Sequence, residues 1–264
     1  MQNNEISFEI EDGVGRITLT RPEKLNALTG HMMTRLMMIL DEAADNPNIR
    51  VLLLTGTGRG FCVGADMSEI GARRKAADPL SSKKFIWERL QKIALKMERM
   101  EKPVIALVNG LARGAGADLA LMCDIRIASS SANFSWGSYI SIAIMAGNGG
   151  TYFLPRLVGV DRALDLLCTG RVVDAKEAGE MRLVTHVVAD AEAPQVALKM
   201  AQQIAAQPAD SVQFYRRAVY QSLGQTLYSH LDMVSSHVAI LGCTAESAAR
   251  VQAFRESRSA QKKS

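Results

Sequence analysis

The sequence has few of the features that hold a secreted or metal-binding protein together. Its four cysteines lie far apart and form no C-x-x-C pair, so their spacing predicts neither a disulfide framework nor a zinc site. The first residues, MQNNEI, lack the basic and apolar regions of a signal peptide, and no apolar run is long enough to span a membrane. We therefore expect a soluble, cytoplasmic protein with reduced thiols.

A strong charge of one sign is absent as well. The net charge is only +4, with acids and bases intermixed, and 48% of the 264 residues are hydrophobic. This composition excludes disorder of the whole chain and does not indicate a nucleic-acid partner, although the mild positive bias suits an anionic ligand. The length accommodates one large domain, or one domain with an appendage.

Three common signatures of nucleotide binding and catalysis are missing. There is no G-x-x-x-x-G-K-[ST] phosphate loop and no G-x-S-x-G nucleophile elbow. The glycines 110, 114 and 116 do not have the spacing of a dinucleotide-binding turn. The four histidines lie away from the glycine-rich segments, and we expect them to be surface or structural residues.

Hydrophobic periodicity predicts an α/β fold. Residues 6–10 and 14–20 alternate apolar and polar around Asp12-Gly13, the pattern of a β-hairpin. Continuous apolar runs at 51–55 and 103–108 predict strands buried on both faces, and 125–128 predicts another. Helical spacing is found at 31–44, 83–100 and 119–123. Alternating strands and helices favour right-handed crossovers in a largely parallel sheet.

The character of the chain changes near residue 190. Residues 193–206, 211–223, 226–241 and 245–257 predict consecutive helices, separated by Pro208, Gly224 and Gly242. We therefore divide the chain into a core at 1–190 and a helical region at 191–264. The apolar faces of these helices exceed what a thin outer layer needs, which favours packing against other subunits.

Two glycine-containing segments follow the two buried strands. The first is Gly58–Met67, which reads GRGFCVGADM, and the second is Asn109–Asp118, which reads NGLARGAGAD and opens a helix. Glycine lets the backbone turn sharply and approach a ligand, and a helix start presents unsatisfied N–H groups. Two N–H groups aimed at one point would make an oxyanion hole. Taken singly, each segment fits an ordinary strand-to-helix turn better than an oxyanion hole.

The combination of segments resembles the enoyl-CoA hydratase/isomerase (crotonase) superfamily. Besides these two segments, the resemblance rests on RPEKLNAL at 21–28, KPVIALVNG at 102–110, GGT at 149–151, LPRLVG at 154–159, LCTG at 167–170 and AKEAGEMRLV at 175–184. The matches extend in order over about residues 6 to 257. The resemblance implies a crotonase-like α/β spiral of ββα turns, followed by C-terminal helices that form a homotrimer or a dimer of trimers.

The resemblance also implies an acyl-CoA site. The backbone N–H groups of Ala65 and Ala115 would form the oxyanion hole for the thioester carbonyl, with Gly114 beside them. The CoA part would lie along Lys24, Leu25, Asp66, Met67 and Ser68, with Trp136 as an aromatic wall. Coenzyme A is then part of the substrate, and no further cofactor, metal, membrane or nucleic acid is expected.

The family's catalytic glutamates are replaced. The first falls on Asp118, whose carboxylate would act on a proton or cap its helix. The second falls on Ser138 or Tyr139 in the segment ANFSWGSY at 132–139, depending on the direction of counting, and neither is a carboxylate. No acid stands at Ala146-Gly147-Asn148 either, where some family isomerases carry an aspartate.

The leading interpretation is hydratase-type addition of water to a 2-enoyl-CoA. The alternatives are double-bond isomerisation, hydrolysis or carbon–carbon cleavage at the same oxyanion hole, and a non-catalytic acyl-CoA-binding or assembly subunit. The acyl group is not defined. Ile140, Ile142, Ile144 and Met145 fit an acyl pocket or the core, and we favour the core for the isoleucines.

Overall fold

The computed structural model describes residues 5–69 and 78–261, and it consists of two compact units. The first unit ends at Ala205 and the second begins at Ala206. This division lies one helix later than the boundary at 190 that we predicted. The helix α10 (Ala193–Ala205) belongs to the first unit because its residues Ala193, Ala197 and Ala201 are buried against one face of the large sheet.

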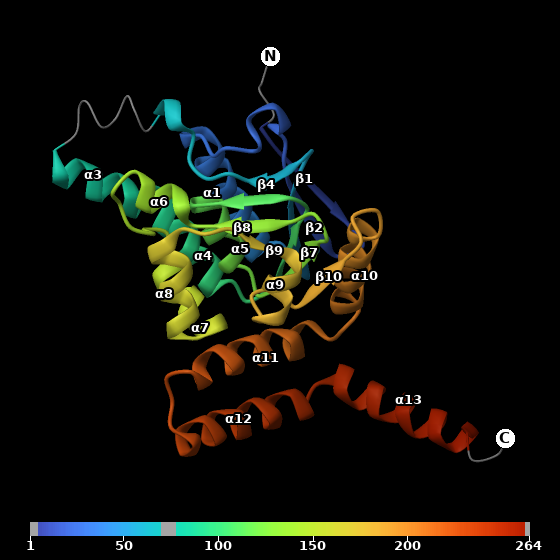
Figure 1. Ribbon diagram of the computed structural model, residues 1–264. Coiled ribbons are helices and arrows are strands. Elements are labelled where there is room, and N and C mark those ends of the chain that lie inside the picture. Colours follow the sequence, from blue (N-terminus) through green and yellow to red (C-terminus); the bar gives the residue numbers. More distant parts are fainter. Residues whose placement is uncertain (1–4, 70–77, 262–264) are drawn as a thin grey trace. The chain divides into compact units, whose positions relative to one another are not determined.

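A six-stranded sheet forms the centre of the first unit (Figure 1). Its order is β1 (Ile6–Glu11), β2 (Val14–Leu19), β3 (Val51–Gly56), β5 (Val104–Val108), β7 (Ile125–Ser129) and β10 (His186–Val188). The first two strands form the predicted hairpin, turned at Asp12 and Gly13 with φ of 49° and 81°. Every other pairing in this sheet is parallel. The predicted α/β class is therefore confirmed.

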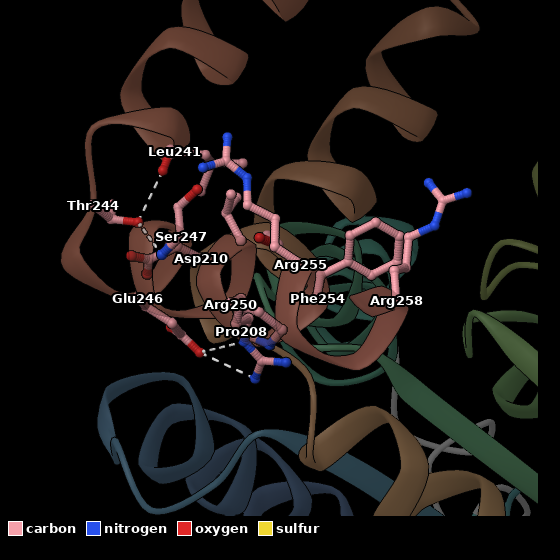
Figure 2. Close-up of a pocket in the computed structure, with 12 residues that line it drawn as sticks. Pro208, Asp210, Leu241, Thr244, Glu246, Ser247, Arg250, Phe254, Arg255 and Arg258 are labelled. Atoms are coloured by element: carbon pink, nitrogen blue, oxygen red, sulfur yellow. Dashed lines mark hydrogen bonds and ion pairs between the residues drawn. The ribbon is translucent and has the colours of Figure 1, made fainter. Parts of the chain in front are cut away.

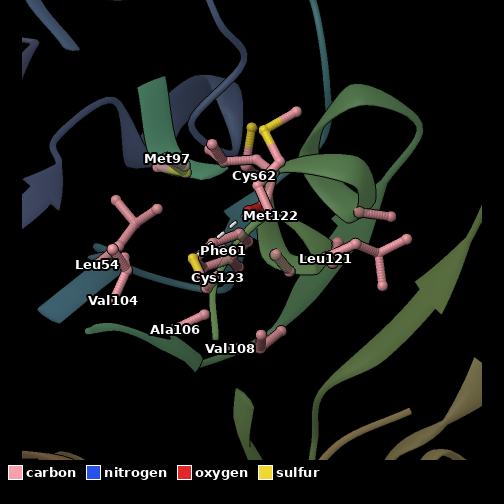
Figure 3. Close-up of a cluster of buried hydrophobic side chains, with 14 of the residues drawn as sticks. Leu54, Phe61, Cys62, Met97, Val104, Ala106, Val108, Leu121, Met122 and Cys123 are labelled. Carbon is pink, nitrogen blue, oxygen red and sulfur yellow. Dashed lines mark hydrogen bonds between the residues drawn. The ribbon is translucent and has the colours of Figure 1, made fainter. Parts of the chain in front are cut away.

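The large sheet is covered on both faces, as the continuous apolar runs predicted. Leu52 and Leu54 of β3 point into the main core, whereas Val51 and Leu53 pack with α10 on the other face. Figure 3 shows part of the main core, where Leu54 lies near Phe61, Cys62 and Met97. Burial on both faces fixes the register of β3, because a slip by one residue would exchange its two faces.

A second sheet of four short strands lies at the ends of the long ones. Its order is β4 (Gly60–Cys62), β6 (Leu111–Arg113), β8 (Asn133–Ser135) and β9 (Val173–Asp174). The strands β4, β6 and β8 follow β3, β5 and β7 along the chain and pair with one another in parallel. A long strand, a short strand and a helix therefore repeat, which produces the expected ββα spiral.

The helices of the first unit surround these sheets. They are α1 (Gly30–Asp45), α3 (Pro79–Ile86), α4 (Lys92–Arg99), α5 (Ala115–Leu121), α6 (Gly137–Ser141), α7 (Gly150–Val158), α8 (Val160–Thr169) and α9 (Ala175–Glu180), with a 3₁₀ turn η1 (Pro22–Lys24). The helix predicted over 83–100 is present in three pieces, since a wide π-helical turn η2 (Trp87–Gln91) separates α3 from α4. Such turns occur often at functional sites.

The second unit consists of α11 (Ala209–Ser222), α12 (Leu227–Gly242) and α13 (Ala245–Gln261), as the sequence predicted. The rings of Phe214 and His237 stack 4.4 Å apart and join α11 to α12. A hollow of about 860 Å³ lies within this unit, and Figure 2 shows Arg250 at its wall in an ion pair with Glu246. Within residues 5–69 and 78–261, every helix is too short or too polar to cross a membrane.

Candidate active site

Two glycines allow β4 and α5 to lie in close contact. A Cβ on Gly116 would lie 2.0 Å from the carbonyl oxygen of Cys62, so only glycine fits there. Gly64 has φ of 94°, in the left-handed region, and a Cβ on it would lie 3.2 Å from the backbone nitrogen of Ala115. The turn after β4 and the start of α5 are therefore neighbours, as the sequence segments predicted.

The backbone N–H groups of Ala65 and Ala115 have no hydrogen-bond partner among the described residues. The peptide groups around Ala65 are nevertheless fixed, because the Leu28 N–H donates to the Gly64 carbonyl (2.7 Å) and the Asp66 N–H donates to the Leu28 carbonyl (2.9 Å). Ala115 is the first residue of α5, where no intrahelical acceptor exists. Two free donors on neighbouring, rigid segments can together bind one oxygen atom.

Asp118 is fully buried on α5, and both of its carboxylate oxygens accept hydrogen bonds from other segments. The indole Nε1–H of Trp136 donates to Oδ1 (2.8 Å), and the hydroxyl of Tyr139 donates to Oδ2 (2.7 Å). The backbone N–H of Asn148 donates to the carboxylate as well. The carboxylate therefore does not act as a cap of α5, which has no side-chain cap.

Burial raises the pKa of the Asp118 carboxyl to about 6, although the hydrogen bonds from Tyr139, Trp136 and Asn148 act in the opposite direction. The pKa of the Tyr139 hydroxyl is raised above its usual range, first by burial and then by the negative charge of Asp118. At neutral pH the pair thus consists of an ionised aspartate and a neutral tyrosine. A carboxylate whose pKa lies close to neutrality is suited to accept and return protons.

Tyr139 connects this buried carboxylate to the outside of the core. It lies on α6 and is partly exposed, whereas Asp118 has no exposed surface. Its hydroxyl also accepts a hydrogen bond from Nδ2 of Asn148 (2.9 Å). A phenol hydroxyl has one hydrogen and two acceptor positions, so one acceptor position is still free.

Ser138 lies beside the start of α5. A Cβ on Gly114 would lie 2.4 Å from the Ser138 hydroxyl oxygen, so this hydroxyl lies directly over Gly114. Ser138 is exposed, and within the described part of the chain its hydroxyl makes no hydrogen bond. The two residues that counting along the sequence left as alternatives thus both lie at the site: Tyr139 contacts the carboxylate, and Ser138 lies over Gly114, which precedes Ala115.

Comparison with known proteins places this arrangement in a family. The profile of the enoyl-CoA hydratase/isomerase family matches residues 9–264. The chain belongs to this family, the crotonase superfamily. It is 34% identical to 1,2-epoxyphenylacetyl-CoA isomerase of Escherichia coli K12 over 97% of both chains, and 34% identical to short-chain-enoyl-CoA hydratase of Clostridium acetobutylicum over 84% of both. A crystal structure of enoyl-CoA hydratase from Bacillus anthracis, 33% identical, superposes with a TM-score of 0.89 over 96% of both chains.

Membership of the crotonase superfamily makes this chain an enzyme of the hydratase/isomerase type. The relatives named above include both an isomerase and a hydratase at equal identity. Similarity to these relatives therefore does not distinguish hydration from isomerisation, and the assignment of the reaction depends on the chemistry of the site itself.

Trp136 does not lie where the sequence analysis placed it. Trp136 was predicted to form a wall of the CoA site, but its side chain is fully buried and its N–H is used by Asp118. It supports the carboxylate from within. Ile140, Ile142, Ile144 and Met145 were assigned to the core or an acyl pocket, with the core preferred for the isoleucines. Ile140, Ile144 and Met145 are exposed, and Ile142 is half-buried. The preference for the core was therefore wrong for Ile140 and Ile144.

The residues predicted to line the CoA groove lie around the turn after Gly64. Lys24, Met67 and Ser68 are exposed, and Leu25 is half-buried with φ of 49°. The carboxylate of Asp66 accepts hydrogen bonds from the hydroxyl and the backbone N–H of Ser68, and these bonds lower its pKa. It also forms an ion pair with Arg21 (3.1 Å). Binding of CoA at these residues stays a prediction.

The sequence did not indicate that Asn148 belongs to the site. The sequence analysis noted only that position 148, just before Gly149-Gly150-Thr151, carries no acidic residue. In the structure Asn148 is 4% exposed and contacts both Asp118 and Tyr139. The described residues contain no group of three or more His, Cys, Asp and Glu side chains that could hold a metal ion.

Proposed function

We propose that this enzyme adds water to the double bond of a 2-enoyl-CoA thioester. The observation that carries the proposal is the hydrogen bond of 2.7 Å from the Tyr139 hydroxyl to the buried carboxylate of Asp118, close to two free N–H groups. The backbone N–H groups of Ala65 and Ala115 would bind the thioester oxygen. One such donor typically contributes about 3 kcal/mol to stabilisation of the transition state.

The hydration can be written with one proton relay. The carbonyl held by Ala65 and Ala115 makes the β-carbon electrophilic, and the Ser138 hydroxyl would hold the attacking water. As the water oxygen bonds to the β-carbon, its proton passes to the Tyr139 oxygen and the Tyr139 proton passes to Asp118. The same relay then runs in reverse and delivers that proton to the α-carbon. One molecule of water is added and the enzyme returns to its starting state.

The test is mass spectrometry of purified protein with a panel of 2-enoyl-CoA and 3-enoyl-CoA esters of short, long, branched and aromatic acyl groups. Addition of one water to some 2-enoyl-CoA, with oxygen taken from labelled water, supports hydration. Unchanged mass for all 2-enoyl esters contradicts it. Hydrolysis is distinguished in the same spectra by release of free coenzyme A.

Double-bond isomerisation is the second candidate, and one observation favours it. Asp118 is the only carboxylate that contacts Tyr139 in the described part of the chain, and both of its oxygens are already used by side chains. Moving a proton from the α-carbon to the γ-carbon of a 3-enoyl-CoA needs one proton-carrying group and no bound water. A shift of the double bond at constant mass would favour this reaction.

A non-catalytic acyl-CoA binder is the alternative from another class. A buried aspartate whose pKa is held near 6 and whose hydrogen-bond partner reaches the surface is more than binding alone requires. Binding of CoA esters without turnover or exchange of any substrate hydrogen would favour the binder.

The second unit supports assembly of several copies. Large apolar side chains that are exposed on its helices, or in the turn after α11, include Tyr215, Leu223, Leu227, Tyr228, Leu231, Val238, Ile240 and Phe254. Exposed apolar area of this kind is typical of subunit interfaces. We propose a homotrimer or a dimer of trimers, which light scattering coupled to size-exclusion chromatography would distinguish from a monomer.

A further inference from the structure

We propose that Asn148 is a positioning residue that fixes the direction of proton transfer between Tyr139 and Asp118. The inference rests on the proposed function, because it concerns the same relay. It adds a residue that neither the sequence motifs nor the family resemblance pointed to.

Asn148 contacts both members of the relay with different groups. Its side-chain Nδ2 donates to the Tyr139 hydroxyl oxygen at 2.9 Å, and its backbone N–H donates to the Asp118 carboxylate. Asn148 is 4% exposed, so water does not compete effectively for either bond. A single residue thus holds the two ends of the relay at a fixed separation.

The chemistry of the amide group sets the direction. The amide NH₂ group can donate but cannot accept, so the Tyr139 oxygen must accept from it. The single Tyr139 hydrogen is then directed to the ionised carboxylate of Asp118, as observed. The remaining lone pair of the phenol oxygen is ready to take a proton from outside. In this state the relay accepts a proton at Tyr139 and stores it on Asp118.

The turn that carries Asn148 is held from two sides. Gln91 of η2 donates from Nε2 to the Gly147 carbonyl oxygen at 2.7 Å. On the other side a Cβ on Gly150 would lie 2.3 Å from Oδ1 of Asp118, so the backbone after Asn148 rests directly against the carboxylate. These contacts prevent the amide from turning away, and the orientation of Asn148 is part of the fold.

Among the residues that the structure describes, the further titratable group that acts on the pair is Cys62 of β4, which influences Tyr139. Burial raises the pKa of the Cys62 thiol to about 12, so it carries no charge at neutral pH. A carboxylate placed at position 148 would therefore be a new charge beside Asp118. Like charges at short distance raise the pKa of a carboxyl group.

The experiment compares Asn148→Asp and Asn148→Ala with the wild type. Asn148→Asp keeps the shape of the side chain but replaces the donor with an acceptor that competes for the Tyr139 hydrogen. The control is Asn109→Ala, since the Asn109 amide also bridges backbone groups, at Gly56 and Gly58, outside the relay. Two properties are measured: titration of Asp118 by ¹³C NMR of the labelled carboxyl, and exchange of the α-hydrogens of butanoyl-CoA with D₂O.

In Asn148→Asp the titration midpoint of Asp118 should rise by about one pH unit or more, and the exchange at neutral pH should slow about tenfold or more. In Asn148→Ala the exchange should slow by about tenfold, with little change in affinity for the ester. Asn109→Ala should change neither property, although it loses stability.

The inference is overturned if both Asn148 variants keep the wild-type titration and exchange, or if Asn109→Ala alters them equally. The titration needs no turnover, so it separates this inference from the proposed function. A wild-type protein that hydrates no ester, together with the expected shift of Asp118 in Asn148→Asp, would contradict hydration while supporting the role of Asn148.

Discussion

The hydroxyl of Tyr139 donates a hydrogen bond of 2.7 Å to Oδ2 of Asp118, and this bond joins a partly exposed residue to one that has no exposed surface. In the proposed relay, Asp118 would therefore exchange protons with a ligand through Tyr139 and not by direct contact. The two residues would then have separate roles: Asp118 would hold the proton, and Tyr139 would transfer it.

The pH dependence of activity follows from the carboxyl pKa of about 6. The base form of Asp118 increases as the pH rises through this value, so we expect kcat/KM to rise tenfold per pH unit below about 6 and to level off above it. Measurement of kcat/KM from acidic to neutral pH checks this. A profile that is flat through this range would show that Asp118 is not the group that titrates.

The same pKa affects stability with the opposite trend. The folded-state pKa of Asp118 is raised from 3.8 to about 6, so between these values the folded chain binds a proton that the unfolded chain releases. Asp118 therefore lowers stability as the pH rises through this window, by roughly 3 kcal/mol in total. Asp118→Asn should remove this dependence. Urea unfolding of both proteins at about pH 4 and about pH 7 measures the difference. The prediction is contradicted if the free energy of unfolding changes by the same amount between the two pH values in both proteins.

Replacing Asp118 by Asn should lower kcat by about 100- to 10,000-fold, because the amide cannot accept the relayed proton. Affinity for a CoA ester should change little, since the free N–H groups of Ala65 and Ala115 are untouched. Asp124→Asn is the matched control: Asp124 accepts a hydrogen bond of 2.7 Å from the Val104 N–H, and an amide oxygen can replace it. Comparable loss of activity in both variants would argue against a catalytic role.

Tyr139→Phe tests the relay separately from the carboxylate. Removal of the hydroxyl breaks the path to Asp118, and we expect kcat to fall about 100-fold or more with a small effect on binding. The pKa of Asp118 should rise as well, because one of its hydrogen-bond donors is lost. Tyr152→Phe, on a half-exposed ring of α7, is the control. Full activity of Tyr139→Phe would mean that water reaches Asp118 without this residue.

Most of the fold could be predicted from the sequence because its long elements are strongly periodic. The run at 51–55 and the helix periodicity at 31–44 match β3 and α1 closely. The short strands β4, β6, β8, β9 and β10 were missed, since two or three residues are too few to show a period. Their positions depend on pairing with one another or with β7, and no local pattern expresses such contacts between distant segments.

The site was predicted only in part, because many of its contacts join residues that are far apart in the sequence. Glycine spacing located the Ala65 and Ala115 N–H groups, because a close backbone approach requires glycine at 64 and 116. The contacts of Asp118 come from residues 18 to 21 positions away and from Asn148, and sequence spacing does not define such contacts. For this reason Trp136 was predicted to contact the ligand, whereas its indole N–H donates a hydrogen bond to the carboxylate of Asp118.

Gly64→Ala should disrupt the proposed oxyanion hole. Its φ of 94° is unfavourable for alanine, and the added Cβ would lie 3.0 Å from the Arg113 carbonyl oxygen and 3.2 Å from the Ala115 nitrogen. We expect kcat/KM to fall about 100-fold or more, because a ligand oxygen can no longer approach the Ala115 N–H, and stability to fall by about 1–3 kcal/mol from backbone strain. Gly224→Ala is the control, since a Cβ there would have no atom within 4 Å and no left-handed φ is required. Steady-state kinetics and thermal unfolding of both variants separate the two effects: if Gly64→Ala lost stability but kept its activity, the Ala115 N–H would not bind the reacting oxygen.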